Sequence, residues 1–313
     1  MNIAIVGPGA IGILFTTMLS KAGQNVCLLD HDKQRVDFIS KNGITVDSKD
    51  KTYNYQVKIT DKAGDLQDID LFIICVKSYD TKDAAMSIKP VLKDSSLVLT
   101  LQNGLGNIEI ISEILGQERV IGGVTNQGAN VISHGKIRHA GFGDTVIGKT
   151  DSKIPAYLRD IREVFNKAGI PTRISKDIRA LIWSKLIINV GINALTAITH
   201  LKNGQLLEYE GTRNILCQAV SEAMKIVKRK RIKLIYDDAI EKTEAVCEAT
   251  AQNISSMLQD VLKKRKTEID YINGAIVKQG QSLGIHTPVN SILMDLVKSI
   301  EASYNKTVCD KEG

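Results

Sequence analysis

Residues 7–12 of this 313-residue chain read Gly7-Pro8-Gly9-Ala10-Ile11-Gly12. The stretch follows an apolar run at residues 2–6 and precedes apolar residues at helical spacing: Ile11, Leu14, Phe15, Met18 and Leu19. A GxGxxG turn between a first strand and a first helix is where a dinucleotide pyrophosphate docks, on the N–H groups of the helix N-terminus. An ordinary glycine-rich turn is the alternative. The strand–turn–helix context favours the cofactor site, and all six residues are predicted to bind it.

Each glycine has an expected task in such a turn. Gly7 allows the tight turn, Gly9 lets the backbone approach a phosphate, and Gly12 lets the helix pack on the strand. The sequence therefore predicts an α/β protein with an N-terminal Rossmann-type dinucleotide-binding domain.

Length and composition are those of an ordinary globular protein of two domains, with 43% hydrophobic and 24% charged residues. The first predicted strand begins at residue 2, so we expect no signal or transit peptide. No apolar run approaches the roughly 18 residues of a membrane span. These features predict a cytoplasmic protein that does not bind a membrane.

Charge and cysteine content argue against two further classes of function. The net charge of +6 suits anionic small molecules but is too diffuse to predict a nucleic-acid partner, and the basic runs at residues 228–231 and 263–266 are expected to be solvated helix ends. The cysteines form no CxxC pair and no Cys/His cluster, so no metal site is expected: Cys27, Cys75, Cys217, Cys247 and Cys309. Cys27 and Cys75 fall in predicted strands and are expected to be reduced core residues.

The first half of the chain alternates strands with helices. Beyond the first strand, further strands are predicted at residues 26–30, 71–76, 96–101, 120–124 and 170–174. A hairpin is predicted over residues 136–148, with Gly141 and Gly143 at its turn, and a helix led by Pro155 follows.

The second half is predicted to be helical. Amphipathic patterns indicate helices at residues 177–199, 208–231, 236–264, 267–283 and 289–304. We therefore predict a dinucleotide-binding domain over residues 1–175 and a helical substrate-binding and catalytic domain over residues 176–313. Because ligands of open α/β sheets bind beyond the carboxyl ends of the strands, the substrate is expected in a cleft at that edge, facing the helical half.

Polar residues at strand ends extend the predicted cofactor site. Asp30 ends the second strand 18 residues past Gly12, where an acidic side chain normally hydrogen-bonds the adenosine ribose and disfavours a 2′-phosphate. His31, Lys33 and Arg35 follow, and they either hold a 2′-phosphate or form a solvated loop.

Two later strand ends carry further candidates. Lys77 follows the strand at residues 71–76 and is expected to reach the nicotinamide ribose or the substrate. Gln102-Asn103-Gly104 ends the next strand, and its amides are candidate donors to cofactor or substrate, although Asn-Gly also forms turns.

One apolar helix carries a polar row. Lys185, Asn189 and Asn193 stand at i, i+4 and i+8, which places them on one helix face. Buried polar groups need partners, so this row indicates a ligand site, with core groups satisfied by neighbouring helices as the alternative.

A second polar set lies further along the chain. Asn253 and Ser256 are expected on one helix face, and Glu268 joins them only if the helix breaks in between. Thr267 to Asp270 looks like a capping box, which supports such a break.

These motifs resemble the ketopantoate reductase family, whose members reduce 2-dehydropantoate to pantoate on the route to pantothenate and coenzyme A. The similarity covers nearly the whole chain: Gly7/Gly9/Gly12, Val76-Lys77, Gln102-Asn103-Gly104, the helix with Trp183, Ser184, Lys185, Asn189 and Asn193, Ser255 to Asp260, and Thr267 to Gly274. The resemblance implies an all-α C-terminal domain like that of 6-phosphogluconate dehydrogenase.

The resemblance also implies roles for individual residues. Lys185 is the general acid for the 2-keto oxygen, and Glu268 is a second catalytic residue that holds the substrate hydroxyl or supports the proton relay. The implied substrate-binding residues are Asn103, Asn189, Asn193, Asn203, Asn253 and Ser256, with Lys77 and Asn103 at the border with the nicotinamide.

One departure from the family pattern concerns the cofactor. The family usually has an arginine just after the second strand that grips the 2′-phosphate of NADPH, whereas this chain has His31 preceded by Asp30. NADP(H) is implied by the resemblance, and our hypothesis is dual or NAD(H)-leaning use. The expected partner is a small-molecule substrate bound by a monomer or homodimer. The alternatives are a reductase of another branched 2-keto acid and a non-catalytic dinucleotide sensor.

Overall fold

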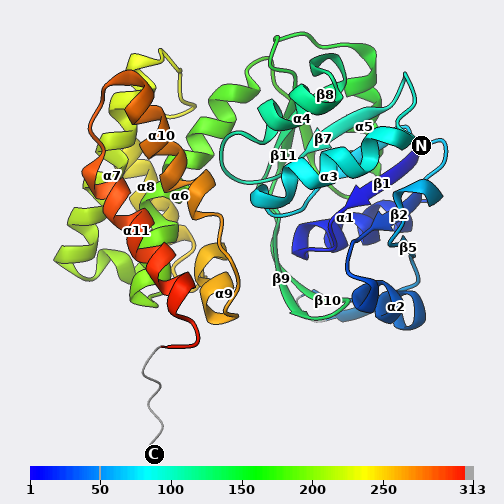
Figure 1. Cartoon of the computed structure of the whole chain (residues 1–313), viewed down its shortest axis with the longest axis horizontal. Coiled ribbons are helices and arrows are strands. Elements are labelled where there is room, and N and C mark those ends of the chain that lie inside the picture. Colours follow the sequence, from blue (N-terminus) through cyan, green and yellow to red (C-terminus); the bar gives the residue numbers. More distant parts are fainter. Residues whose placement is uncertain (49–50, 307–313) are drawn as a thin grey trace, which may run out of the picture. The chain divides into compact units, whose positions relative to one another are not determined.

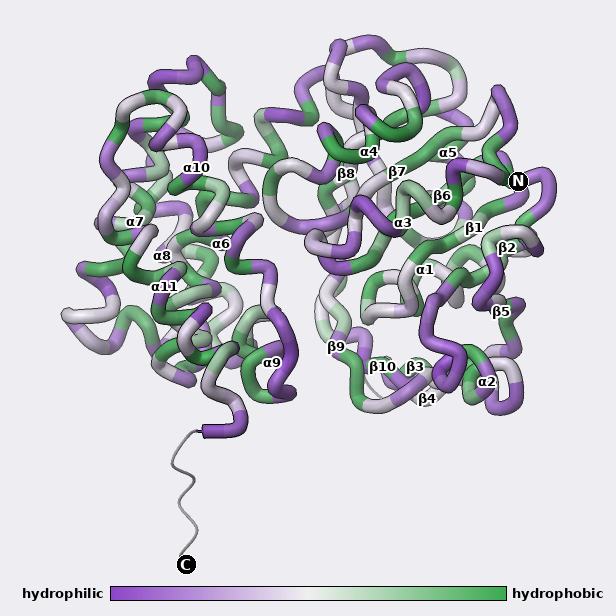
Figure 2. Tube along the Cα trace, in the orientation of Figure 1, coloured by the Kyte–Doolittle hydropathy of each residue, from purple (hydrophilic) through white to green (hydrophobic). Residues whose placement is uncertain are grey.

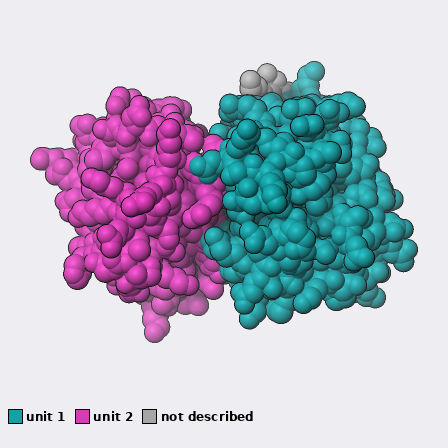
Figure 3. All heavy atoms as spheres, turned by 90° about the horizontal axis from the view of Figure 1, so that it is seen from above, with its two compact units in different colours: residues 1–102, 106–178 teal, residues 103–105, 179–313 magenta. Residues whose placement is uncertain are grey.

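The computed structural model describes residues 1–48 and 51–306. The chain forms two compact units, coloured separately in Figure 3. The first unit holds residues 1–102 and 106–178, and the second holds residues 103–105 and the chain from Arg179 onward. Cys309 lies outside the described residues.

An eight-stranded sheet is the centre of the first unit. Its strand order is β12-β11-β8-β7-β6-β1-β2-β5. The strands are β1 (Asn2–Val6), β2 (Asn25–Leu29), β5 (Lys58–Thr60), β6 (Leu71–Ile74), β7 (Leu97–Thr100), β8 (Val120–Thr125), β11 (Thr145–Gly148) and β12 (Thr172–Ile174). The strands from β5 to β8 pair in parallel, and β11 runs antiparallel to β8. The order reverses between β1 and β6, which is the point where open α/β sheets bind their ligands.

Helices cover both faces of this sheet (Figure 1). They are α1 (Ala10–Lys21), α2 (Lys33–Asn42), α3 (Thr81–Ile88), α4 (Asn107–Leu115) and α5 (Ala156–Lys167). Because strand side chains alternate, Ile3 and Ile5 pack in the core formed with α1 and α5, whereas Ala4 and Val6 pack in the core formed with α3 and α4. The central strands are accordingly hydrophobic along their length (Figure 2), and the predicted Rossmann-type fold is confirmed.

A second, four-stranded sheet lies beside α1 and α2. Its order is β4-β3-β10-β9, formed by β3 (Ile44–Ser48), β4 (Lys51–Tyr55), β9 (Gly128–Ser133) and β10 (Lys136–Gly141). The hairpin predicted over residues 136–148 is therefore wrong. β10 pairs with β9 through a turn that contains Gly135 at φ +65°, while β11 pairs with β8 in the large sheet. Alternating apolar residues in this segment thus serve two different sheets.

The second unit consists of helices around a buried core. They are α6 (Ile178–Thr199), α7 (Glu210–Arg229), α8 (Ala239–Ala249), α9 (Ser256–Leu262), α10 (Asn273–Leu283) and α11 (Pro288–Ser303). Short 3₁₀ turns complete the chain: η1 (Ala63–Asp65), η2 (Ser78–Asp80), η3 (Lys89–Val91), η4 (Gln117–Arg119), η5 (Gly204–Leu207) and η6 (Ile269–Tyr271). Apolar side chains of α6, α7, α10 and α11 share one hydrophobic cluster.

The single helix predicted over residues 236–264 is wrong, because the chain leaves the helix between α8 and α9. The hydroxyl of Thr250 bonds back to the Val246 carbonyl at the end of α8, and Ser255 caps the start of α9 by accepting from the Leu258 N–H. Side-chain hydroxyls at these positions compete with helical hydrogen bonds, which favours two helix ends over one continuous helix.

Helix α6 is the one helix in the described part of the chain that is long and apolar enough to cross a membrane. We expected no apolar run that approaches the length of a membrane span, and by length and composition this expectation is wrong. The folded protein buries 67% of this helix's 18-residue apolar window, as is typical of a helix in the core of a domain.

Candidate active site

The glycine-rich turn is locked by close backbone contacts. Gly7 has φ +102°, and a Cβ there would lie 2.7 Å from Cγ1 of Val76 and 2.8 Å from its backbone nitrogen. A Cβ on Gly12 would lie 2.0 Å from the Gly7 carbonyl oxygen. Only glycine fits both positions, so this turn is held directly beside the end of β6.

The turn leaves space and donors for a pyrophosphate. Gly9 is exposed and is the N-cap of α1, which has no side-chain cap and no acidic residue in its first turn. Among the residues that the structure describes, a Cβ on Gly9 would have one neighbour within 4 Å, the Cys75 carbonyl oxygen at 3.7 Å. Pro8 is buried, whereas Ala10 and Ile11 are partly exposed. An uncapped helix N-terminus with partial positive charge suits a diphosphate, so these residues fit a dinucleotide.

The carboxylate of Asp30 is turned inward onto Arg35. Asp30 is 3% exposed. Its two oxygens accept hydrogen bonds from Nε and Nη2 of Arg35, the second at 2.7 Å, and the Asp32 N–H donates to Oδ1 at 3.2 Å. His31 is exposed, with Nδ1 at 3.7 Å from Asp30. The carboxylate expected to face a ribose thus already has a charged partner, which the sequence pattern did not predict.

Lys77 follows β6 and is partly buried at the residue before η2. A network of side chains holds this segment. The Gln102 amide donates to the Val76 carbonyl at 3.0 Å and to the Thr81 hydroxyl at 2.7 Å, and Thr81 donates to Asn107 at 2.7 Å. Because these bonds use the Gln102 amide inside the protein, its expected role as a donor to a ligand is not supported by the geometry.

The polar row predicted on residues 185–193 lies on α6. Asn193 is buried, and Lys185 and Asn189 are partly buried. Burial lowers the pKa of Lys185 from 10.5 to about 8, and the negative charge of Glu268 acts in the opposite direction by raising it. This lysine can therefore donate a proton near neutral pH far more readily than an exposed lysine.

Glu268 is buried at the start of η6. The preceding residue fixes this turn: Thr267 accepts from the Ile269 N–H at 3.2 Å, and its own N–H donates to Glu301 of α11 at 2.7 Å. Asp270 instead pairs with Lys298 of α11 at 2.5 Å. The helix break predicted before Glu268 exists, but the acid that serves the Thr267 N–H comes from another helix and not from a local capping box.

The loop that contains Asn103 packs on the same turn. The Leu105 N–H donates to the Tyr271 carbonyl at 3.0 Å. Gly104 has φ +83°, and a Cβ there would lie 2.5 Å from that carbonyl oxygen. Asn103 therefore belongs to the same unit as α6 and lies in a loop that packs on the turn begun by Glu268.

Asn203 and Asn253 are neighbours, but Asn253 and Ser256 do not share a helix face. Asn253 is exposed in the loop between α8 and α9, and its carbonyl accepts from the Asn203 N–H at 3.0 Å. Asn203 is buried and donates to Thr250 at 2.9 Å, while its buried Oδ1 has no hydrogen-bond partner within residues 1–48 and 51–306. An unsatisfied buried oxygen is costly, which makes Asn203 a candidate acceptor for a ligand hydroxyl.

Sequence reasoning missed Ser255. This buried side chain caps α9 and contacts the Thr196 hydroxyl of α6 at 2.6 Å, whereas the adjacent Ser256 is partly exposed as the first residue of α9. The sequence alone does not show which of the two adjacent serines caps the helix. Because α9 begins at Ser256, Ser255 is the N-cap.

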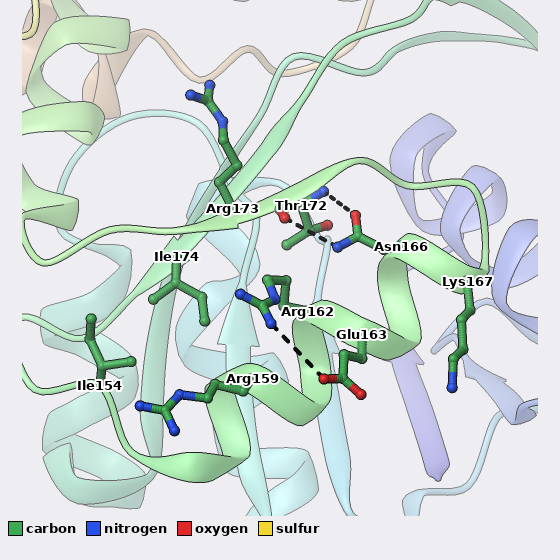
Figure 4. A pocket seen from close by; sticks show the side chains of 9 residues that line it. All are labelled: Ile154, Arg159, Arg162, Glu163, Asn166, Lys167, Thr172, Arg173 and Ile174. Atoms are coloured by element: carbon green, nitrogen blue, oxygen red, sulfur yellow. Dashed lines mark hydrogen bonds and ion pairs between the residues drawn. The ribbon is translucent and has the colours of Figure 1, made fainter.

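A separate hollow lies on the first unit between α5 and β12 (Figure 4). Four of its lining residues are cationic: Arg159, Arg162, Lys167 and Arg173. Arg173 is paired with Asp144 at 3.0 Å. None of the predicted site residues lines this hollow, so it is not part of the candidate site.

The comparisons with known proteins cover both units. Residues 3–152 match the family model described as ketopantoate reductase PanE/ApbA, and residues 177–301 match its C-terminal model. The chain belongs to the ketopantoate reductase family. A 2-dehydropantoate 2-reductase of Halobacterium salinarum is 32% identical over 95% of this chain and 98% of that protein.

Solved structures agree with this assignment. A PanE/ApbA family ketopantoate reductase from Ralstonia eutropha is 33% identical, with a TM-score of 0.90 over 97% of this chain and 100% of that one. D-mandelate dehydrogenase, in a ternary structure with NADH and anilino(oxo)acetate, is 28% identical with a TM-score of 0.90 over the same shares. The fold of an N-terminal parallel-sheet domain and a helical C-terminal domain is thus a family property.

Proposed function

We propose that this protein is a cytoplasmic 2-dehydropantoate 2-reductase, which uses NAD(P)H to reduce ketopantoate to pantoate in pantothenate biosynthesis. The observation that carries the proposal is the polar row on α6, in which the partly buried Lys185 shares one helix face with Asn189 and Asn193. Burial also lowers the pKa of Lys185. This row occurs in a chain that matches the family over both units.

The proposed roles follow from the charge that the reaction creates. A bound nicotinamide supplies hydride to the substrate carbonyl. Negative charge then develops on the keto oxygen, and the Lys185 ammonium stabilises it and donates the proton. Glu268 keeps a larger fraction of Lys185 protonated and holds the substrate hydroxyl.

Amides complete the proposed site. Asn189 and Asn193 stand on the same face of α6 as Lys185, and the buried Oδ1 of Asn203 supplies an acceptor. Further substrate contacts are assigned to Asn103, Asn253 and Ser256, and the cofactor to the turn Gly7–Gly12 with Lys77.

A second candidate is a reductase of another 2-keto acid in the same family. D-mandelate dehydrogenase, as similar in fold as the ketopantoate reductase from Ralstonia eutropha, favours it. Because its structure contains NADH, that neighbour also supports the use of NADH as well as NADPH by this chain.

Initial rates of NADPH and NADH oxidation, measured in parallel, test the proposal. Ketopantoate is expected to give the highest kcat/KM among branched and phenyl-substituted 2-keto acids, with either cofactor. A higher kcat/KM on another keto acid would favour the second candidate. Cofactor binding without turnover on any of them would point to a nucleotide sensor, and a much lower KM for NADPH than for NADH would contradict dual use.

A further inference from the structure

We propose that Asn273 is a positioning residue of the candidate active site: its buried amide, oriented by Asn290 and Glu222, holds the turn that begins with Glu268 against helix α6. The inference rests on the proposed function in one respect, namely that Glu268 and Lys185 act together on the substrate. Asn273 itself touches neither substrate nor cofactor in this proposal and acts through Glu268.

Three polar side chains lie together in the hydrophobic core of the second unit. Asn273 begins α10, Asn290 lies in the first turn of α11, and Glu222 lies on α7. Asn273 and Asn290 are 0% exposed, and Glu222 is 6% exposed. Burial of polar groups is costly unless each is hydrogen-bonded, so the hydrogen bonds of this cluster reveal what it holds in place.

The Glu222 carboxylate determines which way both amides point. It accepts from two backbone N–H groups at the start of α11, at 2.9 and 3.0 Å, and from Nδ2 of Asn290 at 2.8 Å. The same Nδ2 donates to the Ala219 carbonyl at 3.0 Å, which leaves Oδ1 of Asn290 to accept from Nδ2 of Asn273 at 3.0 Å. The other hydrogen of that Nδ2 goes to the Val190 carbonyl at 3.2 Å. The Asn273 amide therefore has one orientation, with its donor group facing α6.

The hydrogen bond from Asn273 to Val190 joins the two elements that carry the proposed catalytic pair. Val190 lies on α6, the helix that holds Lys185. Asn273 is separated by one residue from η6, the turn that Glu268 begins. Helix α10 has no side-chain cap at its start, so its entry from η6 is not fixed by a local cap. The buried amide thus holds the Glu268 turn on the Lys185 helix.

Stability alone does not account for an asparagine at this position. Oδ1 of Asn273 is buried and has no hydrogen-bond partner in the part of the chain that the structure describes. An unpaired buried acceptor lowers the stability of the fold, and an apolar side chain would avoid that cost. The benefit of the amide is therefore assigned to the position of the turn.

The position of the turn matters because the effect of a charge falls with distance. Glu268 raises the pKa of Lys185 against the effect of burial, and a Glu268 side chain that moves away raises it less. Misplacement of a reacting group by about 1 Å can cost about 10²-fold in rate. Loss of the Asn273 amide is thus expected to weaken the action of Glu268 on Lys185.

A double-mutant cycle with Glu268→Gln tests the proposal in the full chain. Asn273→Ala is expected to lower kcat/KM for ketopantoate with NADPH at least about tenfold in the natural background. In the Glu268→Gln background the same change is expected to lower the residual kcat/KM less than about threefold, because Asn273 acts through Glu268. An equal loss in both backgrounds would assign Asn273 a merely structural role and overturn the proposal.

Val227→Ala is the control for lost packing, since it truncates another buried side chain in the same helical core. It is expected to change kcat/KM less than about threefold in either background. A loss as large as that of Asn273→Ala would show that any damage to this core lowers the activity, which would also overturn the proposal.

Asn273→Ala leaves Oδ1 of Asn290 unpaired and risks loss of folding. The double variant N273L/N290L replaces both amides by apolar side chains of the same branching and leaves Glu222 its two backbone donors, so the fold is expected to persist. The same dependence on Glu268 is expected. An unchanged kcat/KM in this variant would contradict a positioning role.

The pKa of Lys185, measured by NMR without substrate, separates this inference from the proposed function. Lysine Cε is isotope-labelled, and the Lys185 resonance is assigned by its absence in Lys185→Arg. Among the described residues, Glu268 is the charged group that acts on the pKa of Lys185. N273L/N290L is therefore expected to lower this pKa as Glu268→Gln does, and to add nothing in the Glu268→Gln background.

An unchanged Lys185 pKa in N273L/N290L would overturn the inference whether or not the protein reduces a keto acid. A lowered pKa in a natural protein that turns over no keto acid would leave the positioning role in place and count against the proposed function alone.

Discussion

Lys185 has two properties that oppose each other: it must be protonated to act as an acid, and it is removed from solvent. It must carry a proton to give to the substrate, and burial makes that proton easier to lose, so its pKa of about 8 is a compromise between the two. Two features of the fold set this pKa: burial of the Lys185 side chain lowers it, and the Glu268 carboxylate raises it.

Replacing Lys185 by alanine is expected to lower kcat by about 10²-fold or more, because the developing oxyanion loses its proton donor. Steady-state kinetics with saturating cofactor measure the effect, and Kd for the cofactor should be unchanged. Lys278→Ala is the control, since this lysine is exposed on α10. A near-normal kcat for Lys185→Ala would remove the assigned role.

The pH profile provides a second prediction at this scale. A general acid must be protonated, so kcat/KM is expected to fall as the pH rises through about 8, the pKa of Lys185. The Glu268 charge raises that pKa, so Glu268→Gln is expected to move the alkaline limb of the residual activity to lower pH. Asp270→Asn removes an exposed acid two residues away and should leave the limb in place. Movement of the limb to higher pH in Glu268→Gln would contradict the assignment.

Helical spacing was sufficient to predict that Lys185, Asn189 and Asn193 share a face, because that depends only on local geometry. The inward turn of Asp30 could not be predicted in the same way. It depends on how Arg35 packs against the end of β2 after the chain has folded. Which residues share one face of a helix is local information, whereas the choice of a side-chain partner is not.

At the scale of elements, the three glycines of the turn are not equivalent. Gly12 is required by the protein's own backbone, since a Cβ would lie 2.0 Å from the Gly7 carbonyl oxygen, whereas a Cβ on Gly9 has room. Gly12→Ala is therefore expected to lower the free energy of unfolding by about 1–3 kcal/mol, through the strain of an overpacked backbone.

Gly9→Ala is expected to leave the free energy of unfolding within about 0.5 kcal/mol of the natural value. It should nevertheless weaken NADPH and NADH binding, because the added methyl group occupies space kept for the ligand. Chemical denaturation and fluorescence titration separate the two effects. Equal loss of stability in both variants would contradict this division of tasks.

Element boundaries were predicted well where one strong pattern covered the segment, as in β1, β6, α6, α7 and α11. Two predictions failed for one reason. Residues 136–148 were interpreted as one hairpin and residues 236–264 as one helix, but each segment contributes to two separate parts of the fold. The helix breaks between Thr250 and Ser255 because their side-chain hydroxyls form hydrogen bonds with the backbone. A hydrophobic periodicity does not reveal such single hydrogen bonds.

At the scale of the whole molecule, ligand binding should stabilise the folded chain. Any ligand that binds the folded state alone raises the free energy of unfolding by RT ln(1 + [L]/Kd), about 2.7 kcal/mol at a hundredfold excess over Kd. NADPH and NADH are each expected to raise the Tm measured by calorimetry, and Lys185→Ala should keep this shift. Gly9→Ala should shift less at the same concentration, and a natural protein with no shift would count against cofactor binding.

The three residues Asn103, Gly104 and Leu105 interrupt the first unit and belong to the second. The polypeptide therefore passes between the units three times, after Gln102, after Leu105 and after Ile178. Cleavage of one peptide bond therefore cannot separate the two units into intact fragments. A gene split at codon 178 would give a C-terminal fragment that lacks the loop whose Leu105 N–H donates to the Tyr271 carbonyl. Complementation between two such fragments would therefore have to re-form this contact between two polypeptides.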